Sequence, residues 1–114
     1  MIECRHIDFS YDSKTILQGI DLNIENGEFL CILGQSGCGK TTLVSMIPRL
    51  YDPDSGEVLI DGINVKDYSL YNLREGIGMV LQNNTLFSGT IEENLRWGNE
   101  NATEEQIVEA AKSA

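Results

Sequence analysis

The stretch GQSGCGKTT, residues 34–42, packs three glycines, one lysine and two threonines into nine positions. Gly34, Gly39, Lys40 and Thr41 fit the spacing GxxxxGK[ST]. In that pattern the glycines let backbone N–H groups turn inward around phosphate oxygens, and the lysine adds a positive charge. We call residues 34–42 the glycine loop, and its spacing predicts a site for a phosphate group.

The segments on either side of the glycine loop support this prediction. Residues 29–33 form a continuous apolar run of the kind found in a strand that is buried on both faces. Residues 40–47 have a helix-like pattern, and Pro48 is expected to end or kink this helix because proline lacks the N–H donor that an interior helical position needs. A strand, a glycine loop and a helix in this order favour a nucleotide site over the alternative, a chance glycine turn at the start of a helix.

Side-chain reach predicts a role for two residues of the loop. Lys40 would extend to the β- and γ-phosphates, and the Thr41 hydroxyl would bind a Mg²⁺ ion that bridges the same phosphates. Kinases, GTPases and transport ATPases share this loop, so the spacing alone leaves the reaction open. The residues expected to contact the nucleotide are Gly34, Gln35, Ser36, Gly37, Cys38, Gly39, Lys40, Thr41 and Thr42.

Composition narrows the classes of partner. The 114 residues include 18 acidic and 8 basic side chains, for a formal net charge of −10, which disfavours nonspecific binding to nucleic acid. The three cysteines form no CxxC pair, so neither a disulfide framework nor a zinc site is indicated. The apolar runs are too short for a membrane span and there is no secretory signal, so we expect a cytosolic location.

The remaining pattern predicts mainly short strands in the first half. Residues 2–11 and 16–24 alternate as in a half-exposed antiparallel pair. Residues 57–60 and 63–66 flank Asp61 and Gly62, which suit the positive φ angles of a tight hairpin turn.

The second half is predicted to be more helical. Residues 69–75 are expected to form one or two helical turns, and residues 77–81 a second short apolar strand that leads into a polar loop. A capping box between Thr103 and Gln106 predicts the start of a helix whose apolar stripe continues to residue 114.

Several stretches together carry a family resemblance. They read IDFSYDSKTILQGIDLNIENGEFLCILGQSGCGKTT (7–42), RLYDPDSGEVLIDG (49–62) and LREGIGMVLQNNTLFSGTIEENLRWG (73–98). In this order they resemble the first part of an ABC transporter nucleotide-binding domain of the exporter type. The resemblance implies an α/β, P-loop NTPase-like fold, with an N-terminal antiparallel β subdomain and the first part of a parallel-sheet core.

The resemblance also assigns residues outside the glycine loop. Tyr11 matches the aromatic residue that stacks on the adenine of ATP, although from the pattern alone it could be an ordinary half-buried strand aromatic. Gln82 matches the loop glutamine that helps to bind Mg²⁺ or to position the attacking water. The segment after it would meet the membrane domain of the transporter, with Thr85, Leu86, Phe87 and Ser88 as the docking surface. The alternative is that Leu86 and Phe87 pack inward beneath the final helix.

Other parts of the family pattern do not occur in residues 1–114. The LSGGQ-type signature, the apolar strand that ends in Asp and a catalytic Glu, and the switch histidine are not found. Residues 1–114 are therefore interpreted as an incomplete nucleotide-binding domain that binds Mg-ATP without hydrolysing it.

The strand at residues 29–33 would then lack its neighbours, which predicts a marginally stable chain that needs the rest of the domain, a second copy or a longer polypeptide. Two other functions stay open: a small nucleotide kinase or GTPase, and an assembly fragment that acts through its exposed sheet edge.

Overall fold

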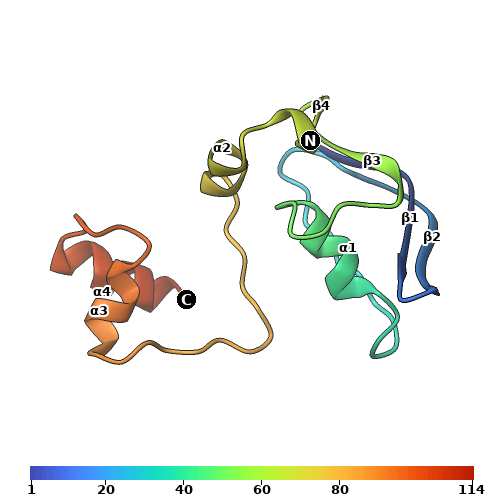
Figure 1. Cartoon of the computed structure of the whole chain (residues 1–114). Coiled ribbons are helices and arrows are strands. Elements are labelled where there is room, and N and C mark those ends of the chain that lie inside the picture. The colour runs from blue at the N-terminus through green and yellow to red at the C-terminus, as the bar shows by residue number, and fades with distance from the viewer. The chain divides into compact units, whose positions relative to one another are not determined.

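The computed structural model describes residues 1–114, which form two compact units, Met1–Gly78 and Met79–Ala114. The first unit is built on a four-stranded antiparallel sheet in the order β2-β1-β3-β4 (Figure 1). Its strands are β1 (Ile2–Tyr11), β2 (Lys14–Ile24), β3 (Ser55–Ile60) and β4 (Ile63–Asn64). The predicted antiparallel subdomain is confirmed.

Both hairpins of this sheet turn on residues with positive φ. Asp12 and Ser13 join β1 to β2 with φ values of 45° and 68°, and Asp61 and Gly62 join β3 to β4 with 50° and 77°. Two successive positive φ angles match the right-handed twist of the flanking strands, and Gly62 adopts this conformation without a steric penalty. The predicted Asp61-Gly62 hairpin is confirmed, but β4 is shorter than expected.

The sheet stops early at β4 because the chain turns into a short helix. The Asn64 side chain accepts a hydrogen bond from the Lys66 N–H, at 3.0 Å, and so caps the 3₁₀ helix η1 (Val65–Asp67). The helix α2 (Leu70–Glu75) follows, capped by the Ser69 hydroxyl, and confirms the helix predicted for residues 69–75.

A carboxylate ties β1 to both of its neighbours where the pairing is irregular. Asp8 lies after a shift of register in β1 and accepts hydrogen bonds from the Ser55 hydroxyl and the Gly19 N–H, each at 2.6 Å. These two hydrogen bonds, with the one from Ser55 as the larger cause, lower the pKa of the Asp8 carboxyl.

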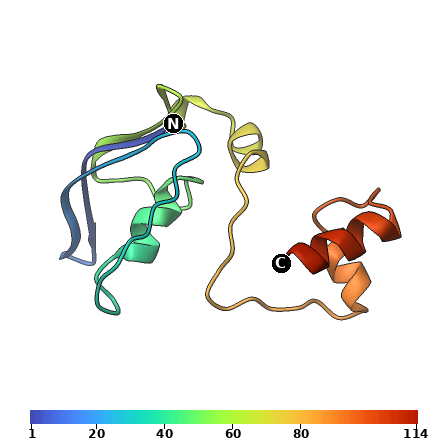
Figure 2. The same ribbon diagram turned by 180° about the vertical axis from the view of Figure 1, so that it is seen from behind.

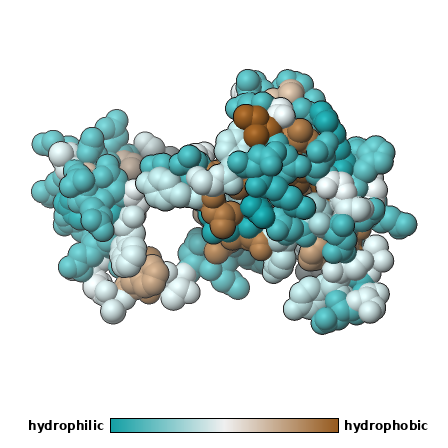
Figure 3. Space-filling view, turned by 45° about the horizontal axis from the view of Figure 1, so that its top comes forward, coloured by the Kyte–Doolittle hydropathy of each residue, from teal (hydrophilic) through white to brown (hydrophobic).

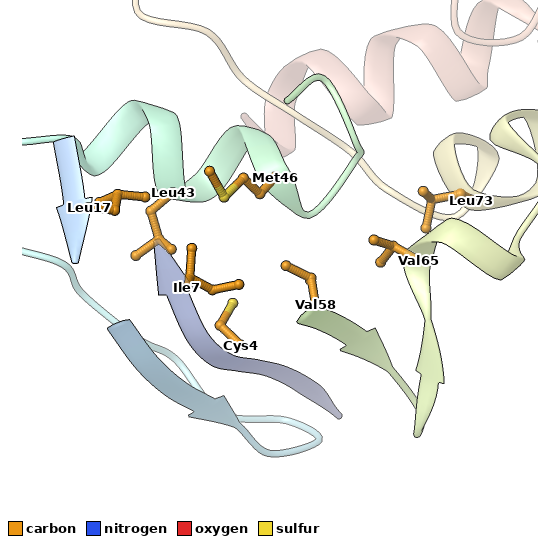
Figure 4. Packing of buried hydrophobic residues seen from close by; sticks show 8 residues of the cluster. All are labelled: Cys4, Ile7, Leu17, Leu43, Met46, Val58, Val65 and Leu73. Atoms are coloured by element: carbon orange, nitrogen blue, oxygen red, sulfur yellow. The ribbon is translucent and has the colours of Figure 1, made fainter. Parts of the chain in front are cut away.

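The core lies between the sheet and the helix α1 (Lys40–Met46), which runs along one face of the sheet (Figures 1 and 2). The helix ends at Met46 and Pro48 follows Ile47, as predicted from the missing N–H donor. Apolar side chains from the sheet, α1, η1 and α2 pack together in Figure 4: Cys4, Ile7, Leu17, Leu43, Met46, Val58, Val65 and Leu73.

The predictions of strands at residues 29–33 and 77–81 are wrong for this structure, since neither run forms a strand. Phe29 and Leu33 are 93% and 86% exposed. The physical reason is that no strand within residues 1–114 pairs with either run, so each lacks the ladder of hydrogen bonds that would make it a strand. Figure 3 shows hydrophobic residues, in brown, at several places on the surface.

The second unit contains α3 (Ile91–Arg96) and α4 (Glu104–Ser113). The predicted capping box between Thr103 and Gln106 is confirmed at the start of α4. An equivalent box between Thr90 and Glu93 starts α3 and was not predicted. None of the helices in the chain combines the length and the apolar character needed to cross a membrane.

Candidate functional site

The glycine loop curls around the ammonium group of its own lysine. Lys40 Nζ donates hydrogen bonds to the carbonyl oxygens of Gly34, at 2.7 Å, and of Gln35, at 2.8 Å. The Cys38 thiol lies 3.6 Å from the same nitrogen. The only cation of the loop is therefore held over the segment where the sequence places a phosphate.

Two glycines leave no room for a side chain in this loop. Gly39 caps α1 with a φ of 98°, and a Cβ added there would lie 2.9 Å from a methyl carbon of Leu17 and 3.0 Å from one of Ile16. A Cβ at Gly34 would lie 2.7 Å from the Cys38 sulfur. Gly39 therefore seats the loop directly against β2, and Gly34 keeps its interior narrow.

The residues of the loop fit a phosphate group. The loop is exposed from Gly34 to Cys38, so a ligand has access to it, and its turn at Gly37 has a φ of 80° with open space beside it. A phosphate oxygen would be a stronger partner for the Lys40 ammonium than the two carbonyls, because both groups would then carry a charge.

Thr41 and Thr42 follow at the start of α1, and the Thr41 side chain is exposed. A single hydroxyl is a suitable protein ligand for Mg²⁺, which takes one or two ligands from the protein and the rest from phosphates and water. Gln35, Ser36 and Cys38 complete the predicted set, and the structure places all of its members in one continuous loop and helix start.

Tyr11 is the last residue of β1 and pairs with Lys14 across the hairpin. Its side chain is 63% exposed, so it is not the half-buried strand aromatic of the alternative interpretation. The neighbouring aromatic residue on β1, Phe9, packs edge-on against Tyr51, with ring centroids 5.7 Å apart. The tip of the β1–β2 hairpin and the glycine loop lie at the same end of the first unit (Figures 1 and 2).

Gln82 lies in the second unit, in an exposed segment without helix or strand. Lys40 belongs to the first unit, so the role of Gln82 beside it stays a prediction.

The predicted docking residues are also in the second unit. Leu86 and Phe87 are 72% and 61% exposed, and the Phe87 ring stacks on Trp97 with centroids 4.8 Å apart and planes 23° apart. The Asn94 side chain is hydrogen-bonded to both backbone groups of Phe87. Our sequence reasoning missed Trp97 and Asn94, although an asparagine inside a short helix is a detectable signal, since it favours caps and turns.

Comparison with known proteins identifies the family to which this chain is related. The family model described as ABC transporter matches residues 17–114. An ATP-dependent lipid A-core flippase of Syntrophus aciditrophicus is 46% identical over 113 residues, covering 99% of this chain and 19% of the flippase. Proteins of Staphylococcus aureus, provisionally named as multidrug export ATP-binding/permease proteins, are 49% identical over 115 residues, covering 99% of this chain and 20% of theirs.

A solved structure agrees with these relatives. The structure of a bacterial Atm1-family ABC exporter with ATP bound superposes with a TM-score of 0.93 at 34% identity, covering 97% of this chain and 20% of the exporter chain. The chain thus spans about a fifth of the length of the relatives that it matches. The glycine loop, the antiparallel sheet beside it and these matches together show that the chain belongs to the ABC transporter family.

Proposed function

We propose that this chain is the Mg-ATP-binding part of an exporter-type nucleotide-binding domain, which couples ATP binding and hydrolysis to transport. The observation that carries the proposal is the loop around Lys40, in which the ammonium lies within 2.8 Å of the Gly34 and Gln35 carbonyls. The names of the relatives, an ATP-dependent flippase and an exporter with ATP bound, support the choice of ATP.

Within this proposal each residue has a distinct task. Lys40 neutralises charge on the β- and γ-phosphates, and Thr41 supplies the protein ligand to Mg²⁺, the ion that balances the remaining charge when bound. Tyr11 offers an exposed aromatic face to the adenine. Gln82 assists the metal or the attacking water through its amide oxygen.

The chain on its own is proposed to bind ATP and not to hydrolyse it. Hydrolysis needs a general base to activate water, and the family's acidic pair, signature sequence and switch histidine do not occur in residues 1–114. The rest of the domain, or a second copy of it, would supply them.

We further propose that the domain sits on the cytoplasmic face of a membrane and docks on the transporter's membrane domain through Leu86 and Phe87. Support comes from the exposure of both side chains, because apolar side chains left open in a loop mark an interaction surface. The relatives that carry export and permease functions in one chain are consistent with such a partner.

Isothermal titration calorimetry with Mg-ATP tests the nucleotide site. Lys40→Ala should weaken binding by one or more charge-assisted contacts of about 1.5 to 3 kcal/mol each, that is, about tenfold or more. Lys112→Ala is the matched control, because Lys112 is an exposed lysine of α4, and its affinity should equal that of the wild type. Equal affinity of Lys40→Ala and wild type would contradict the proposal, and tighter binding of GTP than of ATP would favour the GTPase alternative.

The same protein samples should release no phosphate above background. Turnover that the Lys40→Ala substitution abolishes would show that residues 1–114 hold the whole catalytic apparatus after all.

A further inference from the structure

Asn94 holds the exposed Leu86–Phe87 segment through two hydrogen bonds and makes a third to the start of its own helix. Its Oδ1 accepts the Phe87 N–H at 2.7 Å, and its Nδ2 donates to the Phe87 carbonyl at 3.0 Å and to the Thr90 carbonyl at 2.9 Å. The amide group thus pairs with both polar groups of Phe87, as a neighbouring strand would. One side chain satisfies backbone groups in a segment that has no helix or strand of its own.

We call the two hydrogen bonds between the Asn94 side chain and the Phe87 backbone the Asn94 clamp. The position of Asn94 in its helix indicates what the clamp does. Asparagine is a poor residue for a helix interior, yet it occupies the fourth of six positions in α3. None of the residues of α3 is fully buried, so packing in a core does not explain this helix. Its start is independently secured by the Thr90–Glu93 capping box. The asparagine therefore serves the preceding segment, with α3 as its rigid support.

The clamp determines where the two apolar side chains lie. With its backbone held, Phe87 stacks on Trp97 on the outside of the unit, and Leu86 stays open to solvent. An unclamped apolar pair would sample many conformations and would have to be ordered at the moment of binding. Ordering a side chain or loop in advance removes that entropic cost from the binding step.

We propose that Asn94 is a positioning residue, which holds Leu86 and Phe87 in the conformation that docks on the membrane domain. The proposal rests on the docking role given to these residues under the proposed function. It adds a residue that acts through the backbone of Phe87.

The first test uses the chain alone and the substitution Asn94→Leu, which preserves the size of the side chain and removes all three hydrogen bonds. Amide exchange of the Phe87 N–H should become about tenfold faster or more, because it loses its acceptor. Emission of Trp97, the one tryptophan of the chain, should shift as the Phe87 ring leaves it. Asn84→Leu makes the same change at an exposed position of the same loop and should alter neither signal.

The second test uses the assembled transporter that carries this sequence, with a photo-crosslinking residue at Leu86. Crosslinking to the membrane domain should fall about fivefold or more in Asn94→Leu and less in Asn94→Asp, which keeps the acceptor for the Phe87 N–H. Asn84→Leu should crosslink like the wild type. Mg-ATP affinity should stay within about twofold of the wild-type value in all variants. General unfolding would lower this affinity, so the measurement distinguishes it from a local effect of the substitution.

The results of these tests distinguish the positioning role of Asn94 from docking through Leu86 and Phe87. A clamp that is lost in Asn94→Leu while crosslinking stays at the wild-type level would overturn the positioning role and leave docking intact. A wild-type transporter that gives no crosslink from Leu86 would overturn the docking proposal itself, and the role of Asn94 with it.

Discussion

The two runs at 29–33 and 77–81 are more apolar than the strands of the antiparallel sheet, yet only the sheet residues form strands. Ile7 is fully buried in β1, a strand that pairs with β2 on one side and β3 on the other, whereas Phe29 and Leu33 are almost fully exposed. Each strand of the sheet finds its partner within residues 1–78, but no partner exists there for residues 29–33. The comparison teaches that apolar character makes a strand only when a neighbour completes its hydrogen bonds.

The largest expected effect comes from truncating one residue of each region, Ile7 in the sheet and Leu33 in the exposed run. Ile7→Ala should destabilise the chain by about 2 to 5 kcal/mol, because it opens a cavity in the core beneath α1. Leu33→Ala removes the same number of carbons from an exposed position and should change the free energy of unfolding by no more than about 0.5 kcal/mol. Urea denaturation followed by circular dichroism measures both. A Leu33→Ala loss as large as that of Ile7→Ala would show that the run packs into the core.

Self-association offers a second test of the exposed run. Phe29 and Leu33 present apolar surface that a second copy of the chain can cover. Phe29→Ser combined with Leu33→Ser should raise the concentration at which dimers form by about tenfold or more, since burying one large apolar side chain contributes about 1.5 to 3 kcal/mol. Sedimentation velocity across a concentration series gives the result, with Thr15→Ser on the exposed hairpin as control. Unchanged association would exclude this run as the contact.

The smallest effect concerns the carboxylate that fastens the sheet. Hydrogen bonds from Ser55 and Gly19 lower the folded-state pKa of Asp8, so its stabilisation is complete above about pH 5. The stabilisation is lost as the pH falls through the folded pKa, below the ordinary aspartate value of about 3.9. Asp8→Asn should therefore show a flatter decline of the urea midpoint between pH 5 and 3. Asp12→Asn, in the exposed turn, should decline like the wild type.

Much of the local structure was predictable from neighbouring residues. The glycine loop, the end of α1 before Pro48, the Asp61-Gly62 turn and the Thr103–Gln106 box all depend on interactions that span a few residues. The strands predicted at residues 29–33 and 77–81 did not form, because strand formation depends on partners that the local sequence does not contain. The Asn94 clamp was missed for a related reason, since its partner lies seven residues away in a segment without a periodic pattern.

By itself the sequence determined the glycine loop, its lysine and threonine, the two tight turns and the helix starts, because backbone preferences and short-range hydrogen bonds decide these. Only the tertiary structure decided which apolar runs became strands and where Tyr11 and Phe87 lie. Burial and strand pairing are shared between segments far apart in the chain, so no single stretch encodes them.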